Sequence, residues 1–131
     1  MKKISLLTKT AFHAYNIILI IIYLYPGSIL GWLMYGNIEK QPQLTSDFLV
    51  FSSNHLYAFL ILSLLGFFAF SKSNQKFLFI YLFCISFCLE LSHILIPDRS
   101  FEYSDLIGNI FGVLIIFILS KLFKIFRKKN V

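Results

Sequence analysis

Residues 90–112 read ELSHILIPDRSFEYSDLIGNIFG, a segment rich in polar and charged residues between two strongly apolar stretches. The segment holds four of the six acidic residues, together with a histidine, an arginine and a proline, and apolar sequence flanks it on both sides. Charges beside hydrocarbon are costly and are rarely left there without a partner or a purpose. We therefore expect a helical hairpin with a polar site near its connector.

The composition of the whole chain predicts an integral membrane protein. Of its 131 residues, 58% are hydrophobic and only 14% are charged. A soluble domain of this length could not bury so much apolar surface, whereas lipid solvates the outer faces of membrane helices. The expected fold is all-α: a single polytopic membrane domain over residues 1–131, with four transmembrane helices.

Hydropathy places the four spans at about residues 6–25, 48–70, 77–96 and 105–123. The first span ends at Pro26-Gly27. A signal peptide is the alternative, but no small-x-small cleavage site follows, so a retained anchor is favoured. Pro97 marks the end of the third span. The connector after it is short, which predicts that the third and fourth spans form an antiparallel hairpin.

The basic residues cluster at the ends of the apolar segments. A net charge of +6 could indicate nucleic-acid binding, but this distribution argues against it and fits the positive-inside rule. Both termini are therefore expected in the cytoplasm, with the basic tail near anionic headgroups of the lipid bilayer. The ten cations on the predicted inner side are Lys2, Lys3, Lys9, Lys72, Lys76, Lys121, Lys124, Arg127, Lys128 and Lys129.

Glu90 and His93 are the first candidates for chemistry, because they lie one turn apart on one face of the third span. Either could act as a general acid or base; the alternative is a hydrogen-bonded contact that locks two helices. A Glu-x-x-His pair also occurs among the ligands of di-iron bundles, but those need two such motifs and further carboxylates. Only one occurs here, and neither a metal nor a cofactor is expected.

His55 is the third catalytic candidate, at a similar distance from the outer surface in the second span, with Asn54 beside it. A hydrogen-bonded core histidine is the structural alternative. Arg99 has a planar fork that suits a bidentate grip on carboxylate or phosphate. A salt bridge to Asp105 or Glu90 and contact with an anionic lipid headgroup are both open for it.

Asp105 and Asn109 share one face of the fourth span, where Gly108 and Gly112 form a ridge of small residues. Such a ridge lets two helix backbones pack closely, which would bring Asp105 and Asn109 toward the third span and Glu90. The sequence thus predicts a single binding site. Its expected residues are Asn54, His55, Glu90, His93, Arg99, Asp105 and Asn109.

At these residues the chain resembles the VanZ-like family of small bacterial membrane proteins. The resemblance rests on Asn54-His55, on Glu90-x-x-His93, on 97–100 (PDRS) and on Asp105-Leu106-x-x-Asn109 followed by Gly112. It extends over essentially the whole chain. It implies a multi-span protein of the bacterial cytoplasmic (inner) membrane, in a family whose namesake is associated with glycopeptide resistance, against teicoplanin.

Three functions remain open from the sequence. The first is a binder of a lipid-linked or amphiphilic cell-envelope molecule in a polar pocket near the outer leaflet. The second is an intramembrane acid–base enzyme that acts on a lipid-linked substrate. The third is a non-catalytic assembly partner of another membrane protein, using the Gly108 and Gly112 ridge. The absence of a recognised nucleophile motif favours the first.

Overall fold

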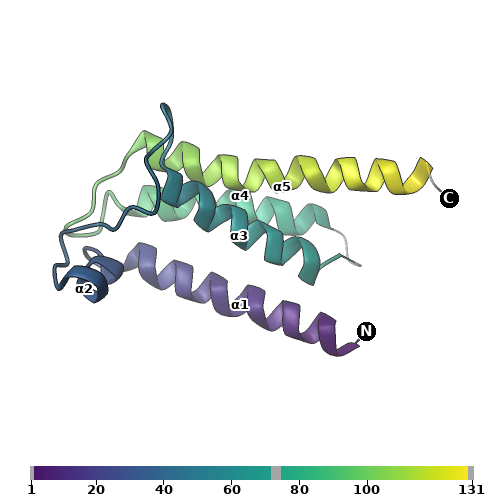
Figure 1. Ribbon diagram of the computed structural model, residues 1–131, viewed down its shortest axis with the longest axis horizontal. Helices are drawn as coiled ribbons and strands as arrows, with labels where there is room; N and C mark the ends of the chain where they lie inside the picture. The colour runs from purple at the N-terminus through teal and green to yellow at the C-terminus, as the bar shows by residue number, and fades with distance from the viewer. Residues whose placement is uncertain (1, 72–74, 130–131) are drawn as a thin grey trace.

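The computed structural model describes residues 2–71 and 75–129, which fold entirely into helices and connections (Figure 1). No strand occurs in these two ranges, so the expected all-α class is confirmed. Lys72, one of the cations of the charge pattern, lies outside the described residues. The helices are α1 (Lys2–Leu24), α2 (Ile29–Tyr35), α3 (Ser53–Ala69), α4 (Gln75–Ser92) and α5 (Tyr103–Lys129).

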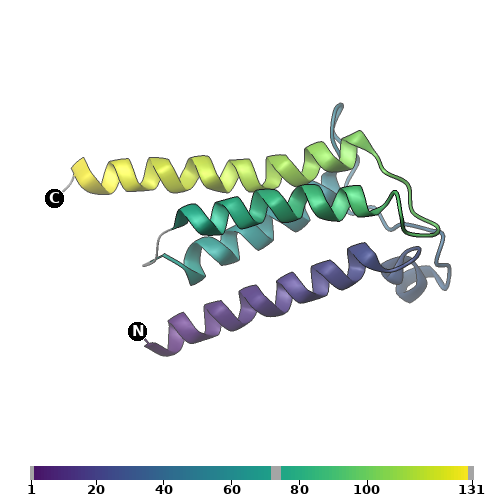
Figure 2. The ribbon, with the colours of Figure 1, turned by 180° about the vertical axis from the view of Figure 1, so that it is seen from behind.

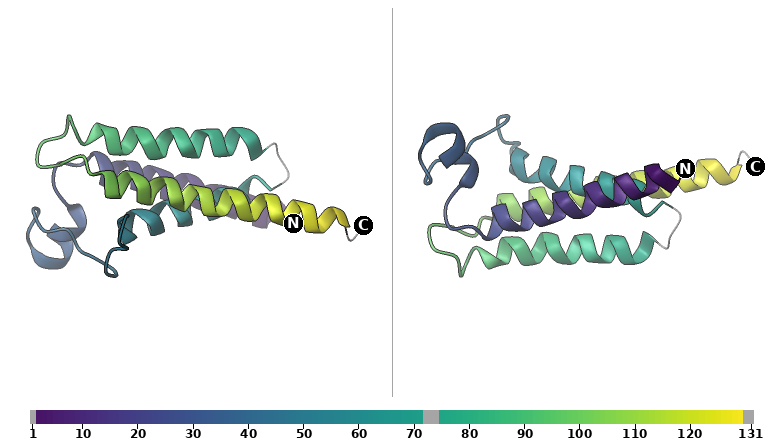
Figure 3. Two further views of the ribbon diagram at one scale, coloured as in Figure 1. Left: turned by 90° about the horizontal axis from the view of Figure 1, so that it is seen from above. Right: turned by 90° about the horizontal axis from the view of Figure 1, so that it is seen from below.

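The four long helices run side by side, and the short α2 lies at one end with the long connections (Figures 1 and 2). Seen from above, α3 and α4 lie on opposite sides of α5 (Figure 3, left). The most extensive helix contact joins α3 to α5, followed by α1 with α3. We call the end with α2 and the connections 25–52 and 93–102 the loop end, and the opposite end the terminal end.

Three of these helices are long and apolar enough to cross a membrane: Leu6–Leu24, Gln75–Ser92 and Tyr103–Phe126. The apolar helix α3 is shorter, with 17 residues. Large hydrophobic side chains cover the outer faces, including Ile18, Ile80 and Leu119, each about half exposed. Surfaces of this kind are stable in lipid and not in water.

The core lies between α3, α4 and α5, where apolar side chains are removed from solvent. Phe59 and Leu62 of α3, Leu82 of α4 and Val113 of α5 have no exposed surface. The helix α1 covers this core from one side with buried residues of its own. Those residues are Phe12, Leu19 and Tyr23.

The helix α3 begins at Ser53, later than the span expected from residue 48. Asp47 Oδ1 accepts a hydrogen bond from the Ser53 backbone N–H at 2.9 Å and so satisfies a donor of the first turn. The Ser52 N–H bonds to the Ser104 carbonyl at 3.1 Å, which ties the connection to the start of α5. The apolar residues 48–51 therefore stay outside the helix, with the Phe51 ring stacked on Phe111 at a centroid distance of 5.2 Å.

The helix α4 ends at Ser92, earlier than the expected residue 96. Beyond it, the backbone N–H groups of His93, Ile94 and Leu95 each bond to a carbonyl three residues earlier, at 3.1, 3.2 and 2.9 Å. Such tight turns are common where a helix stops, and Pro97 disfavours helical backbone just before it. Glu90 consequently lies in the last turn of α4 and not deep within the span.

The helix α2 lies between the first two expected spans, where the sequence analysis placed no helix. Ser28 caps its start, since the Ser28 Oγ accepts from the Gly31 N–H at 2.9 Å. Gly31 has no room for a side chain, because a Cβ there would overlap the Lys40 carbonyl oxygen at 1.6 Å. The chain therefore folds back over α2 and covers the loop end.

The glycine ridge of α5 packs against α3, and not against the third span as the sequence suggested. A Cβ on Gly108 would lie 2.7 Å from the Ser52 carbonyl oxygen, and one on Gly112 would lie 2.6 Å from that of Leu56. These neighbours are backbone atoms that cannot move aside alone. The two glycines are thus the reason that α3 and α5 approach so closely.

Replacing Gly112 by alanine is expected to destabilise the fold, because its methyl group would separate α3 from α5. Overpacking of this kind costs about 1–3 kcal/mol. Reversible unfolding in detergent micelles, followed by circular dichroism, measures the change. Gly66→Ala is the matched control: its new methyl would meet only the side-chain ends of Phe12 and Leu78. Equal stability of both variants would contradict the close packing of α3 on α5.

Candidate functional site

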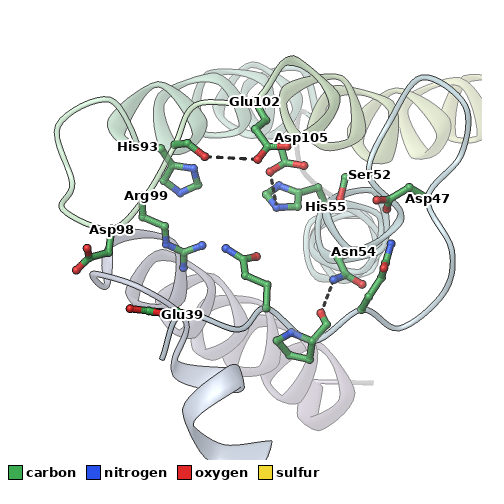
Figure 4. Close-up of a pocket in the computed structure, with 14 residues that line it drawn as sticks. Glu39, Asp47, Ser52, Asn54, His55, His93, Asp98, Arg99, Glu102 and Asp105 are labelled. Atoms are coloured by element: carbon green, nitrogen blue, oxygen red, sulfur yellow. Dashed lines mark hydrogen bonds and ion pairs between the residues drawn. The ribbon is translucent and has the colours of Figure 1, made fainter. Parts of the chain in front are cut away.

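A polar pocket of about 380 Å³ opens at the loop end (Figure 4). We call it the loop-end pocket. His93 and Arg99 face its centre from one side and His55 faces it from the other, whereas the Asp98 carboxylate points away (Figure 4). Five carboxylates and one guanidinium line it. The lining residues are Glu39, Gln41, Pro42, Gln43, Asp47, Ser52, Asn54, His55, His93, Asp98, Arg99, Ser100, Glu102 and Asp105.

His55 is the residue at which the long helices meet. Its Nε2 lies 3.3 Å from Asp105 Oδ2 on α5, and its Nδ1 lies 3.7 Å from Glu90 Oε2 on α4. The same Nδ1 is 2.9 Å from the Tyr23 hydroxyl of α1 and 3.2 Å from Asn109 Oδ1. One imidazole of α3 thus contacts polar groups from the other three long helices.

The surrounding hydrogen bonds indicate which nitrogen of His55 carries a hydrogen. Asn109 Nδ2 donates to the Ser86 carbonyl at 3.3 Å, which turns its Oδ1 toward His55. The Tyr23 hydroxyl donates to that Oδ1 at 2.7 Å, so the oxygens facing Nδ1 offer it lone pairs. Nδ1 is then a donor. The Nε2 lone pair is left facing the Asp105 carboxylate, an arrangement that calls for a shared proton or a cation.

Glu90 is a fully buried carboxylate with one oxygen satisfied and one not. Its Oε1 accepts from the Glu102 backbone N–H at 3.2 Å and lies 3.2 Å from His93 Nδ1. His93 Nε2 faces the Tyr23 carbonyl at 3.2 Å, where it can only donate. The His93–Glu90 contact therefore also holds a proton. Glu90 Oε2 has no hydrogen-bond partner among the described residues.

Tyr23 belongs to the site although the sequence reasoning missed it. Besides bonding to Asn109 and His55, its ring stacks on His93 with the centroids 5.6 Å apart. Only 6% of the residue is exposed. The sequence showed it as one of many aromatics in apolar helices. Its one signal was its place in the last full turn before Pro26, level with the predicted depth of His55.

Arg99 does not form the salt bridge to Asp105 or Glu90 that was one of its expected roles. Its Nη2 donates to the Ile22 carbonyl at 2.9 Å and its Nε to the Tyr25 carbonyl at 3.3 Å. It thereby caps the end of α1, whose last carbonyls lack helical partners. Burial lowers the pKa of the Arg99 guanidinium, but an arginine stays cationic in proteins.

Asn54 clamps the connection between α2 and α3. Its Nδ2 donates to the Pro42 carbonyl at 2.7 Å, and its Oδ1 accepts from the Leu44 N–H at 3.0 Å. Both ends of the amide are therefore engaged in holding the wall of the loop-end pocket.

The structure brings the seven predicted binding residues together at the loop end of the helical bundle. Five of them line the loop-end pocket, namely Asn54, His55, His93, Arg99 and Asp105. The other two, Glu90 and Asn109, are fully buried behind His55. The catalytic candidates Glu90, His55 and His93 lie within this group.

An all-α chain with three helices long and apolar enough to cross a membrane, and with a buried ionisable cluster at one end, has the features of a membrane protein. A family model described as VanZ/LLP1 matches residues 7–124. The chain belongs to the VanZ/LLP1 family, as the resemblance indicated. No curated protein and no solved structure matches it significantly.

Replacing Tyr23 by phenylalanine is expected to lower the free energy of unfolding by about 1–3 kcal/mol. The reason is that Asn109 Oδ1 and His55 Nδ1 would lose a buried partner. Unfolding in detergent measures the change. Tyr103→Phe is the control, since Tyr103 is 76% exposed at the start of α5. A Tyr23→Phe protein as stable as that control would show that the hydroxyl is not part of a buried network.

Proposed function

We propose that the protein crosses the bacterial cytoplasmic membrane four times as a four-helix bundle, with both termini in the cytoplasm. Three helices meet the length requirement, and α3 is an apolar helix of 17 residues packed against α1, α4 and α5. The basic segments at the start of α1 and the end of α5 both lie at the terminal end (Figure 1). The acidic residues gather at the loop end, which is consistent with an external face.

We further propose that the loop end binds an amphiphilic cell-envelope molecule. The observation that carries this proposal is the junction of the polar loop-end pocket with an apolar cavity of about 350 Å³. Residues of α1, α2 and α3 line the apolar cavity, among them Leu19, Leu30 and Ile61. An amphiphile could place its headgroup in the first and its chain in the second. The two share Gln41, Pro42, Asn54, His55, His93 and Arg99.

The charges of the loop-end pocket restrict the headgroup. Its lining carries five carboxylates but only one guanidinium, so a headgroup with anionic groups alone would be repelled. A phosphate could pair with the free N–H groups of Arg99, while hydroxyl, amide or amino groups donate to the carboxylates. We therefore propose a lipid-linked envelope molecule or phospholipid whose headgroup combines a phosphate with such donors.

Replacing Arg99 by glutamine is expected to reduce the lipid that copurifies with the protein. A charged hydrogen bond to phosphate contributes about 1.5–3 kcal/mol, so the dissociation constant for the lipid should rise by about ten-fold or more and bound lipid per chain should fall. Mass spectrometry of lipids extracted from the purified protein measures this quantity. Lys40→Gln is the matched control, because Lys40 also belongs to the loop end but contacts the Tyr35 ring instead of lining the pocket.

The apolar cavity provides the second arm of that experiment. Ala58→Leu adds bulk to its wall, whereas Ala14→Leu adds the same bulk to an exposed position on α1. The proposal expects less copurified lipid with the first variant and unchanged lipid with the second. Identical lipid content and identity in the wild type, Arg99→Gln and Ala58→Leu would contradict amphiphile binding at this site.

An acid–base enzyme acting on a lipid-linked substrate is the second candidate function. It is favoured by one observation, the placement of His55 between Asp105 and Glu90 in the pocket wall. A histidine flanked by carboxylates suits proton transfer to or from a bound group. In that case Glu90→Gln would abolish turnover of a lipid-linked substrate while the protein remained folded. Assembly through the glycine ridge is less favoured, because that ridge already packs against α3.

A further inference from the structure

Three acceptor groups converge between α3, α4 and α5, and no lysine or arginine of residues 2–71 and 75–129 forms an ion pair with them. One imidazole nitrogen of His55 and one carboxylate oxygen each of Glu90 and Asp105 lie within 4.8 Å of one another. The Nε2 lone pair of His55 faces Asp105 Oδ2 at 3.3 Å, as derived above. The side chains come from three different helices, so the fold and not local sequence creates the group.

The charges of this group are not balanced by lysine or arginine. In the described ranges, the ion pairs of Glu90 and Asp105 are with histidines alone. The nearest guanidinium, that of Arg99, donates to the carbonyls at the end of α1. The proton of the His93–Glu90 contact lies at Glu90 Oε1 and not between the two carboxylates. Two carboxylates in a poorly solvated site repel each other unless a positive charge lies between them.

Glu90 Oε2 gives an independent indication of a ligand. It belongs to a side chain with no exposed surface, it has no hydrogen-bond partner among the described residues, and it points toward the His55 ring. A buried carboxylate oxygen without a partner is costly. A proton shared by His55 and Asp105 would leave Glu90 Oε2 unsatisfied, whereas one divalent cation could contact all three acceptors.

We propose that His55, Glu90 and Asp105 bind a divalent transition-metal cation of the zinc or manganese type. One imidazole and two carboxylates are ligands that both ions accept. Ligands about 2.1 Å from a tetrahedral ion lie about 3.4 Å apart, close to the 3.3 Å between His55 Nε2 and Asp105 Oδ2. Three protein ligands leave a further position toward the loop-end pocket, which His55 and Asp105 line.

The surroundings of His55 suit a metal ligand. A coordinating histidine almost always donates its other ring N–H to an oxygen that fixes the orientation of the ring. Here Nδ1 lies 3.2 Å from Asn109 Oδ1 and 2.9 Å from the Tyr23 hydroxyl. Glu90 is likewise held by the Glu102 N–H through its other oxygen. In the sequence, Glu90-x-x-His93 alone offered too few ligands for a metal. In the structure, the proposed ligands are Glu90, His55 and Asp105, and His93 is not one of them.

The test is a titration of the purified full chain in detergent micelles with zinc chloride, after treatment with a chelator. Bound zinc per chain is measured by equilibrium dialysis with elemental mass spectrometry. We expect one saturable equivalent in the wild type and a dissociation constant about ten-fold or more higher in Asp105→Asn and in Glu90→Gln. Manganese should bind to the same site more weakly.

Two controls separate this site from surface binding. Asp98→Asn removes an exposed carboxylate of the same pocket that points away from the cluster, and asparagine tolerates the positive φ of 58° at that position. His13→Gln removes an exposed histidine from α1. Both should bind zinc as the wild type does.

Thermal unfolding in the presence of chelator shows whether a variant that binds zinc poorly is still folded. Asp105→Asn should be as stable as the wild type without metal, because it removes one of the two repelling charges. Zinc should raise the melting temperature of the wild type and of the two controls, but not that of Asp105→Asn. The proposal is overturned if the wild type shows no saturable zinc equivalent. It is also overturned if the ligand variants and the two controls bind zinc with the same affinity.

Discussion

At Gly108 and Gly112 the backbones of α3 and α5 approach more closely than a side chain would permit, and the arrangement of the loop end follows from this contact. A Cβ on Gly108 would lie 3.1 Å from the His55 Cβ. The His55 ring is therefore held against the face of α5 that carries Asp105 and Asn109. A larger residue at position 108 would move the imidazole away from both.

The polar cluster also fastens α1, which has fewer contacts with the other helices than α3 has. The Tyr23 hydroxyl reaches Asn109, the Tyr23 carbonyl meets His93, and Arg99 holds the last carbonyls of the helix. The apolar cavity lies between this end of α1 and α3. A molecule bound there would touch the residues that hold α1 in place, so occupancy of the cavity and the position of α1 should be coupled.

The sequence predicted the class of fold and the neighbourhood of the site because both depend on the contrast between apolar and charged residues. Apolar segments with few charges could be recognised from composition, and Glu90 stood out because it interrupts one of them. The sequence predicted less well which residues contact each other. Arg99 was paired with carboxylates because opposite charges attract, but the unsatisfied carbonyls at the end of α1 lie closer to it. Periodicity carries no information about such neighbours.

Helix boundaries and Tyr23 escaped prediction for related reasons. The start of α3 depends on Asp47, whose carboxylate caps Ser53 from outside an otherwise apolar run. The role of Tyr23 depends on Asn109, 86 residues later in the chain. In a chain with seven tyrosines, the only local signal for Tyr23 is its place in the last full turn before Pro26. Long-range packing supplies this information, and the glycines of α5 determine that packing.

A double-mutant cycle between His55 and Asp105 tests most directly whether α3 and α5 bring these side chains together. The free energy of unfolding would be measured in chelator-treated detergent samples for the wild type, His55→Gln, Asp105→Asn and the double variant. Direct contact predicts a coupling energy of about 0.5–3 kcal/mol. Effects that add to within about 0.3 kcal/mol would mean that the two side chains do not interact, and the arrangement described for the loop end would be wrong.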